Sequence, residues 1–204
     1  MKKSIPATND FCPQTLFLYG TYKEDGNPNF GLFCWFSYYW DSELGVMACI
    51  GGEKLTKERI DKTKIFSANL VTEELLPLAD FWGNKNGNTD NKMNVVAEIE
   101  KGSILNVPTL VKSPWIYELE VTQSIPLNDG EIFLCKIRNV LVDESVWDKD
   151  ISHEEKIKLI KPAQSVGETY FAWNGNAIGV WGEPMKKEKS YSIISKNKSG
   201  GASL

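Results

Sequence analysis

The chain has 204 residues, of which 42% are hydrophobic and 25% are charged. These values are typical of a globular protein with a substantial core and exclude a disordered or fibrous chain, so we expect one domain over 1–204. The net charge of −4 argues against a nucleic-acid partner, because phosphate contacts need a clustered basic surface. No stretch has the length of a membrane span and no signal peptide is recognisable, so we expect a cytoplasmic protein.

Cysteine and histidine are too sparse for the usual metal and hydrolase sites. The four cysteines, Cys12, Cys34, Cys49 and Cys135, are widely spaced and form no C-x-x-C pair, which favours free thiols over a zinc site. The single histidine, His153, stands among charged residues and is expected to be exposed near the start of a short helix. We therefore predict neither a metal site nor a Ser-His-Asp arrangement.

The opening part of the chain predicts three successive strands. The first, 15–22, is rich in aromatic and β-branched residues and ends at the turn formers of 23–28. The second is the apolar and aromatic run 30–39. After a break at 40–43, the third strand runs over 45–52.

The middle of the chain predicts two short helices on either side of a buried strand. Sparse apolar positions among charges indicate a surface helix over 54–63, and 65–70 is the buried strand. Thr72 opens a sequence that resembles a capping box and leads into a helix over 75–81. The polar stretch 83–93 predicts a loop.

Two longer strands and a third helix follow. Residues 115–124 alternate apolar and charged side chains, which indicates one buried face and one exposed face, and 131–144 is a second long strand. A charged helix is expected around 153–160. Two short aromatic runs, 169–173 and 177–181, complete the predicted elements.

The predicted ordered core covers about 10–182, and the lysine-rich segment 185–204 predicts a solvated, flexible tail. Strands dominate the core and follow one another through short connections, whereas a parallel sheet would need a helix after nearly every strand. The pattern therefore predicts a mainly β fold, an antiparallel barrel with a few short peripheral helices. Neither a G-x-G-x-x-G sequence nor a P-loop is present, so a bound nucleotide would be held by other means.

The segment 30–40 carries more aromatic side chains than one face of a barrel can use. One interpretation is an aromatic core together with a hydrophobic dimer interface. The other is a platform for a flat, conjugated ligand such as an isoalloxazine ring, covered by a partner subunit. The residues alone leave both interpretations open.

The segment 49–56 ends a strand in two glycines and then begins a helix with a lysine and a threonine. A helix start offers free backbone N–H groups to an anion. Lys54 would add a positive charge and Thr56 a hydroxyl, a combination that suits a phosphate monoester. A capped helix on a solvated surface would show much the same pattern.

Several short motifs occur in an order that resembles a known family. They are Pro28-Asn29, Cys34-Trp35-Phe36, Lys54-x-Thr56, Phe66-x-x-Asn69 and the loop sequence of 87–93. Their order and spacing resemble the flavin reductase-like, FMN-binding split-barrel proteins, particularly the flavoredoxin-like branch, over about 10–182. The resemblance implies a homodimeric, antiparallel, Greek-key-like split β-barrel with FMN near the subunit interface.

The resemblance also implies which residues bind FMN, with the phosphate role falling on Lys54 and Thr56. The other implied contacts are Asn29, Trp35, Phe36, Ser37 and Tyr38 for the ribityl chain and ring, Ile50 and Gly51 through the backbone, Asn69 at the edge of the pocket, and Lys92 near the flavin. Relatives often carry arginine where this chain has Lys54 and asparagine where it has Arg59. Arg59 is therefore an alternative phosphate ligand.

The function that the resemblance implies is that of an FMN-dependent oxidoreductase of the flavin reductase type. Such an enzyme accepts hydride from NADH or NADPH on its flavin and passes electrons to an acceptor that the sequence does not identify. Because the redox chemistry belongs to the cofactor, no catalytic side chain is predicted. Two alternatives stay open: a flavin-binding protein that carries or stores electrons without turnover, and a cofactor-free dimeric scaffold.

Overall fold

The computed structural model describes residues 2–10, 12–88, 92, 93, 95, 97–147 and 150–174. The strands of this part are β1 (Gln14–Thr15), β2 (Phe17–Tyr22), β3 (Pro28–Phe33), β4 (Phe36–Asp41), β5 (Glu43–Gly51), β6 (Ile65–Leu70), β7 (Ile99–Lys101), β8 (Pro108–Leu110), β9 (Trp115–Leu127), β10 (Gly130–Val142), β11 (Ala163–Val166) and β12 (Thr169–Ala172). Its helices are α1 (Leu55–Thr63), α2 (Leu76–Gly83) and α3 (His153–Ile160). Within this part, none of the helices is long and apolar enough to cross a membrane. The run 177–181 and the tail 185–204 lie outside the described residues.

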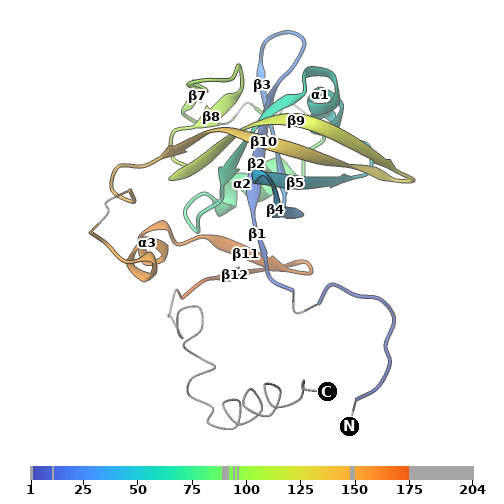
Figure 1. The fold of residues 1–204 in the computed structure, drawn as a ribbon, viewed down its shortest axis with the longest axis vertical. Coiled ribbons are helices and arrows are strands. Elements are labelled where there is room, and N and C mark those ends of the chain that lie inside the picture. The colour runs from blue at the N-terminus through green and yellow to red at the C-terminus, as the bar shows by residue number, and fades with distance from the viewer. Residues whose placement is uncertain are drawn as a thin grey trace, which may run out of the picture.

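Seven strands form one antiparallel sheet in the order β3-β2-β6-β9-β10-β5-β4. Its two edge strands, β3 and β4, follow each other directly in the chain, so the sheet has to curl. The curl brings β4 close to β2, where the rings of Phe36 and Phe17 stack with centroids 4.2 Å apart. Figure 1 shows the long β9–β10 hairpin crossing the other strands of the barrel. The predicted mainly β split barrel is therefore confirmed.

The curled sheet is buried on both faces where β2 and β6 lie. Its inner face holds the main core, to which β2, β5, β6, β9 and β10 contribute Phe17, Tyr19, Val46, Ala48, Ile50, Phe66, Leu119, Phe133 and Cys135, among others. Its outer face packs against α2 through a second cluster that includes Leu18, Phe30, Leu75, Ala79 and Trp82. Burial on both faces explains why residues 16–19 of the predicted strand 15–22 are continuously apolar instead of alternating.

The run 30–39, predicted as one strand, is in fact two. β3 ends at Phe33 and β4 begins at Phe36, and the Phe36 N–H donates to the Cys34 carbonyl (3.0 Å) across the break. The two strands lie at opposite edges of the sheet. The prediction was wrong because a continuous apolar run has no period that would mark an interruption. The curl of the sheet imposes the break.

The three predicted helices all occur, and each begins within one residue of its predicted start. The short strands β7, β8 and β11 were not predicted. They pair outside the barrel, in a two-stranded sheet and in the three-stranded sheet β1-β11-β12. Strands of three or four residues show too little periodicity to be recognised from sequence.

Candidate functional site

α1 begins just after β5, at the turn that two glycines mark in the sequence. Gly52 has a φ of 66°, a left-handed conformation that glycine adopts without steric cost. Lys54 occupies the N-cap position, and no side chain caps the helix. The first N–H groups of α1 therefore lack a side-chain acceptor and, together with the helix dipole, they favour an anion.

A cavity of about 250 Å³ adjoins this helix start, and we call it the lysine cavity. It is lined by Gly31, Leu32, Phe33, Glu53, Lys54, Leu55, Thr56, Trp82, Gly83, Asn84, Lys85, Asn86, Gly87 and Lys92. Three of these residues are lysines. Glu53 is the single acid among them, and its carboxylate is ion-paired with Lys57 (3.0 Å). Among the described lining residues lysines outnumber acids, which suits the cavity to a phosphate group.

Thr56 presents its hydroxyl to the lysine cavity from the first turn of α1. The side-chain amide of Asn29, which is also buried, donates to Thr56 Oγ1 (3.0 Å). Because the oxygen accepts this bond, the hydroxyl proton stays available for a ligand. A Cβ on Gly31 would lie 2.9 Å from Thr56 Oγ1, so the glycine keeps this part of the cavity open. The Asn29 hydrogen bond thus fixes the position of the Thr56 hydroxyl at the cavity.

Lys92 reaches the lysine cavity from the segment after α2 and is 5% exposed. The indole Nε1 of Trp82 donates to the Lys92 carbonyl (2.9 Å), and Lys92 Nζ lies 3.5 Å from the Trp82 carbonyl. Trp82 is itself held by parallel stacking on Phe30, with centroids 5.1 Å apart. A rigid aromatic pair therefore anchors the lysine to α2 and β3.

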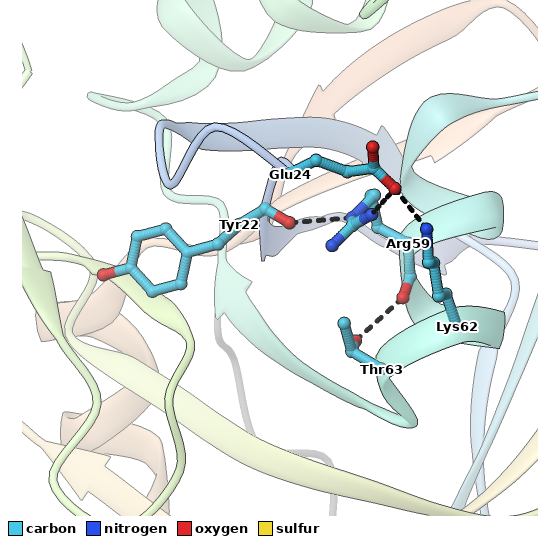
Figure 2. Close-up of polar contacts among 5 residues, drawn as sticks. All are labelled: Tyr22, Glu24, Arg59, Lys62 and Thr63. Carbon is cyan, nitrogen blue, oxygen red and sulfur yellow. Dashed lines mark hydrogen bonds and ion pairs between the residues drawn. The ribbon is translucent and has the colours of Figure 1, made fainter.

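Arg59, the alternative phosphate ligand, lies elsewhere (Figure 2). Its Nε donates to the Tyr22 carbonyl (2.9 Å) and its Nη1 to the Glu24 carboxylate (3.2 Å). Lys62 pairs with the same carboxylate, and the Lys62 hydrogen bond is the largest of the influences that hold the pKa of Glu24 below its usual range. Arg59 is not among the residues that line the lysine cavity. The guanidinium fixes the β2–β3 hairpin against α1.

β4 turns two of the predicted ring-contacting residues toward the inside of the barrel. Phe36 and Tyr38 pair in register with Ala48 and Val46, whose side chains are fully buried in the core. Directly paired side chains share one face of a sheet, so the Phe36 and Tyr38 rings face inward. Ile50 is fully buried in the same core. Ile50 could therefore meet a ligand only through its backbone, as predicted for it.

Trp35 and Ser37 lie on the other side of β4. A Cβ on Gly51 would lie 3.5 Å from the Trp35 ring, so the indole covers the end of β5 where the turn to α1 begins. Trp35 is 49% exposed, and Ser37 is exposed as well. Trp35 therefore lies beside the turn that leads to Lys54, whereas Ser37 pairs with Met47, further back along β5.

Asn69 is fully buried, and its side chain is engaged within the barrel. Its amide donates to the Leu18 carbonyl (2.9 Å) and to Ser67 Oγ (2.9 Å), and its carbonyl oxygen accepts from the Leu110 N–H (2.9 Å). These bonds tie β6 to β2 and β8. Asn69 is not among the residues that line the lysine cavity.

From the predicted set, the structure therefore brings together Lys54, Thr56 and Lys92, with Asn29 behind Thr56. Sequence reasoning missed Lys85, which lines the same cavity and holds its Nζ 5.8 Å from the Phe81 ring centroid. The loop composition of the segment was evident in the sequence. Nothing in it indicates that Lys85 returns to the start of α1, because this depends on how α2 packs against β3.

Solved structures share this fold. The flavoredoxin of Desulfovibrio vulgaris (Miyazaki F) has a TM-score of 0.80 at 22% identity, covering 90% of this chain and 100% of that one. The flavoredoxin from Methanosarcina acetivorans has a TM-score of 0.81 at 17% identity, covering 92% and 98%. The FMN-binding protein from Thermus thermophilus, with bound p-hydroxybenzaldehyde, has a TM-score of 0.71 at 18% identity, covering 88% and 97%. At these identities the likeness concerns the fold.

The sequence itself identifies the family. A search of curated proteins found no match. The family model described as the flavin reductase like domain, in contrast, matches residues 10–154, which include most of the barrel and the lysine cavity. In agreement with the order of its motifs, the chain belongs to the flavin reductase-like domain family.

Proposed function

We propose that the chain is an FMN-dependent oxidoreductase of the flavin reductase type, with the FMN phosphate held in the lysine cavity. The observation that carries the proposal is the convergence of Lys54, Lys85 and Lys92 on an uncapped helix start. A phosphate monoester carries close to two negative charges and several acceptor oxygens. Lysine ammonium groups, backbone N–H groups and the Thr56 hydroxyl match both its charge and its hydrogen-bonding capacity.

The size of the lysine cavity suits one end of FMN. Its volume of about 250 Å³ is below the roughly 300–1,000 Å³ of pockets that enclose a drug-sized ligand. The cavity would therefore take the phosphate and the adjoining part of the ribityl chain, and the ring would be held outside it. Trp35, exposed beside the β5–α1 turn, is the side chain we assign to the ring, together with the Gly51 backbone and with Ser37 on the same side of β4.

When bound, FMN would supply the redox group, which takes hydride from NADH or NADPH and passes electrons to an acceptor. The side chains of the protein would bind and orient the flavin. Asn29 holds the Thr56 oxygen so that its proton is free to donate, and Trp82 fixes Lys92 through the Lys92 carbonyl. Burial raises the pKa of the Cys135 thiol to about 12, so this cysteine is not a nucleophile at neutral pH. We assign no catalytic side chain.

Two findings support a flavin over another phosphate ester. The matching family model is described as the flavin reductase like domain. The Thermus thermophilus protein of the same fold is described as FMN-binding. A flavin carrier without turnover would present the same cavity, so reduction by a nicotinamide donor is the measurement that separates carrier from enzyme.

We also propose that the protein is a homodimer. Exposed apolar side chains lie together on the β4–β5 hairpin, where Trp40 is 75% exposed and Leu44, its directly paired neighbour, is 48% exposed. Contiguous exposed apolar surface of this kind marks interaction sites in monomer structures. Sedimentation equilibrium at micromolar concentration should give twice the chain mass, and a single-chain mass would contradict the proposal.

The visible absorbance spectrum tests the proposed function. Purified protein is mixed with FMN and then, without oxygen, with NADH or NADPH. A bound flavin whose absorbance bleaches with the donor is the expected result. A flavin that binds and does not bleach with either donor would overturn the reductase assignment, and a protein that binds no FMN would overturn the cofactor as well.

A lysine substitution tests the phosphate site directly. Lys54→Ala should weaken FMN binding by roughly 1.5–3 kcal/mol, about 10- to 150-fold in dissociation constant, because a charge-assisted contact is lost. Lys62→Ala is the matched control, since Lys62 lies on the same helix, is exposed and pairs with Glu24. Equal dissociation constants for Lys54→Ala and the unmodified protein would refute the assignment of Lys54.

A further inference from the structure

A second cavity, of about 390 Å³, lies where the inner side of the barrel meets α3, and we call it the aromatic cavity. Its walls come from β2, β4, the start of β9 and α3, whereas the lysine cavity is built around α1. Figure 1 shows α1 at the upper right of the barrel and α3 at its lower left in this view. The volume falls within the roughly 300–1,000 Å³ of small-molecule sites, so the aromatic cavity is a separate candidate site.

Flat rings form most of the wall of this cavity. The Phe36 and Tyr117 rings lie 5.9 Å apart with planes tilted by 30°, and the Tyr38 ring stands edge-on to Phe36 at 5.7 Å. Trp115 and Trp147 meet edge to face, with centroids 6.4 Å apart. Rigid rings offer edges and faces to another ring at little cost in conformational entropy. The shape and chemistry of the wall therefore favour a planar aromatic ligand.

Two kinds of hydrogen-bonding group interrupt the apolar wall. The Tyr38 and Tyr117 hydroxyl oxygens lie 2.6 Å apart, so one donates to the other. The Trp115 indole nitrogen is buried and has no hydrogen bond of regular geometry. Burial raises the pKa of the Tyr117 phenol, and the nearby Trp115 side chain offsets part of this rise. Buried donors in native proteins almost always have a partner. The Trp115 nitrogen is an exception to this rule, and because it is buried, the Tyr38 and Tyr117 hydroxyls are the polar groups of the wall.

The ionisable side chains that α3 contributes to the cavity are basic. Lys156 and His153 line it from α3, and no aspartate or glutamate occurs among its lining residues in the described part of the chain. Lys156 Nζ lies 5.4 Å from the Trp147 ring centroid. Aromatic cages also bind organic cations, but the Lys156 ammonium group, with no carboxylate among the described lining residues, disfavours a cation here. An anionic substituent on the ligand would be favoured instead.

We propose that the aromatic cavity binds a small planar aromatic carboxylate, with its ring against Phe36, Tyr117 and Trp115 and its carboxylate near Lys156 and His153. This inference does not rest on the flavin site, because the lining residues of the two cavities do not overlap. It adds a ligand class to the flavin that we propose for the lysine cavity.

Calorimetric titration with benzoate tests the proposal, with benzamide and cyclohexanecarboxylate as comparison probes. Benzoate should bind at millimolar concentration or below. Benzamide, which lacks the charge, and cyclohexanecarboxylate, which lacks the flat ring, should each bind about tenfold more weakly. Equal affinity for benzoate and benzamide would overturn the anionic part of the proposal, and no benzoate binding would overturn it entirely.

Substitutions on α3 locate the site. Lys156→Met should weaken benzoate binding about tenfold, whereas Lys158→Met, a control on the same helix whose lysine pairs with Glu154, should leave it unchanged. Ile157→Trp should fill the cavity and abolish benzoate binding, while a cooperative thermal unfolding transition shows that the variant is folded. Benzoate binding that survives both Lys156→Met and Ile157→Trp would place the ligand elsewhere and overturn the proposal.

Discussion

The two cavities of this molecule are built in opposite ways. The lysine cavity takes its helix start, a lysine and a hydroxyl from one contiguous segment, 53–56, and adds lysines from the segment after α2. The aromatic cavity draws its wall from residues between Thr15 and Trp173, with no long contiguous piece. A site that is largely local can be recognised in a sequence by its spacing. A site assembled from distant strands leaves no comparable local signal.

The two cavities also differ in what holds a ligand. The lysine cavity offers ammonium groups and helix N–H groups, whose attraction depends on charge and on salt. The aromatic cavity offers ring surface, whose contribution depends on the apolar area that is buried. Substitutions that remove charge should therefore act on one cavity and spare the other, and this expectation can be tested.

The largest effect should come from removing two lysines of the lysine cavity together. Lys54→Met/Lys92→Met should weaken FMN binding by roughly 100-fold or more, because each lysine contributes a charge-assisted contact, and should leave benzoate binding unchanged. Spectrophotometric FMN titration and calorimetry measure the two affinities. Lys62→Met/Lys64→Met removes the same total charge outside the cavity and is the control. A parallel loss of benzoate affinity would mean that the two cavities act as one site.

A substitution at Glu118 should lower the stability of the barrel and leave ligand binding at both cavities unchanged. Glu118 is fully buried on β9, and its carboxylate accepts hydrogen bonds from the N–H groups of Ser103 (2.9 Å), Ile104 (3.0 Å) and Leu105 (2.5 Å) and from the Asn139 side chain (2.8 Å). Burial, the largest single influence, raises the pKa of Glu118, but these hydrogen bonds together outweigh it and hold the pKa below its usual value of 4.5. Glu118→Gln should lower the free energy of unfolding by about 1–3 kcal/mol at neutral pH.

The pH dependence of this loss has a defined sign. A carboxyl whose folded-state pKa is depressed contributes stability above its unfolded-state pKa and loses it as the pH falls through the folded-state value. The difference in urea unfolding between the Glu118→Gln variant and the unmodified protein should therefore shrink as the pH falls below 4.5. A difference that stays constant into acid would show that the ionised carboxylate is not the source of the stability.

The smallest effect on binding should come from Arg59, the residue that sequence reasoning offered as an alternative phosphate ligand. Arg59→Met should destabilise the β2–β3 hairpin by about 1 kcal/mol, because the hydrogen bond from Nε to the Tyr22 carbonyl is lost, and should leave FMN affinity unchanged. Thermal unfolding and FMN titration give the two readouts. Lys62→Met, which removes only the exposed partner of Glu24, should change neither. A marked loss of FMN affinity in Arg59→Met would return the phosphate role to this arginine.

The elements that sequence analysis located correctly are those with short-range signals. Ser152 is the N-cap of α3: its hydroxyl accepts from the Glu155 N–H (3.2 Å), and the Glu155 carboxylate accepts from the Ser152 N–H (2.8 Å). This capping box is formed by neighbouring residues and is visible in the sequence. The signal for the β5–α1 turn, two glycines followed by a lysine and a threonine, also lies within a few neighbouring residues. The strand break at Cys34 and Trp35 was missed because both halves of the run are apolar, so that no local pattern separates them.

The sequence by itself determined that the chain forms an antiparallel barrel with three short helices, and that a lysine and a threonine stand at one helix start after two glycines. Turn residues, caps and hydrophobic period act over a few positions and are visible in one dimension. Only the tertiary structure decided that Phe36 and Tyr38 face inward while Trp35 faces outward, that Lys85 and Lys92 join Lys54, and that Arg59 turns away. These outcomes depend on how the sheet curls and where α2 packs, and such long-range contacts leave no periodicity in the sequence.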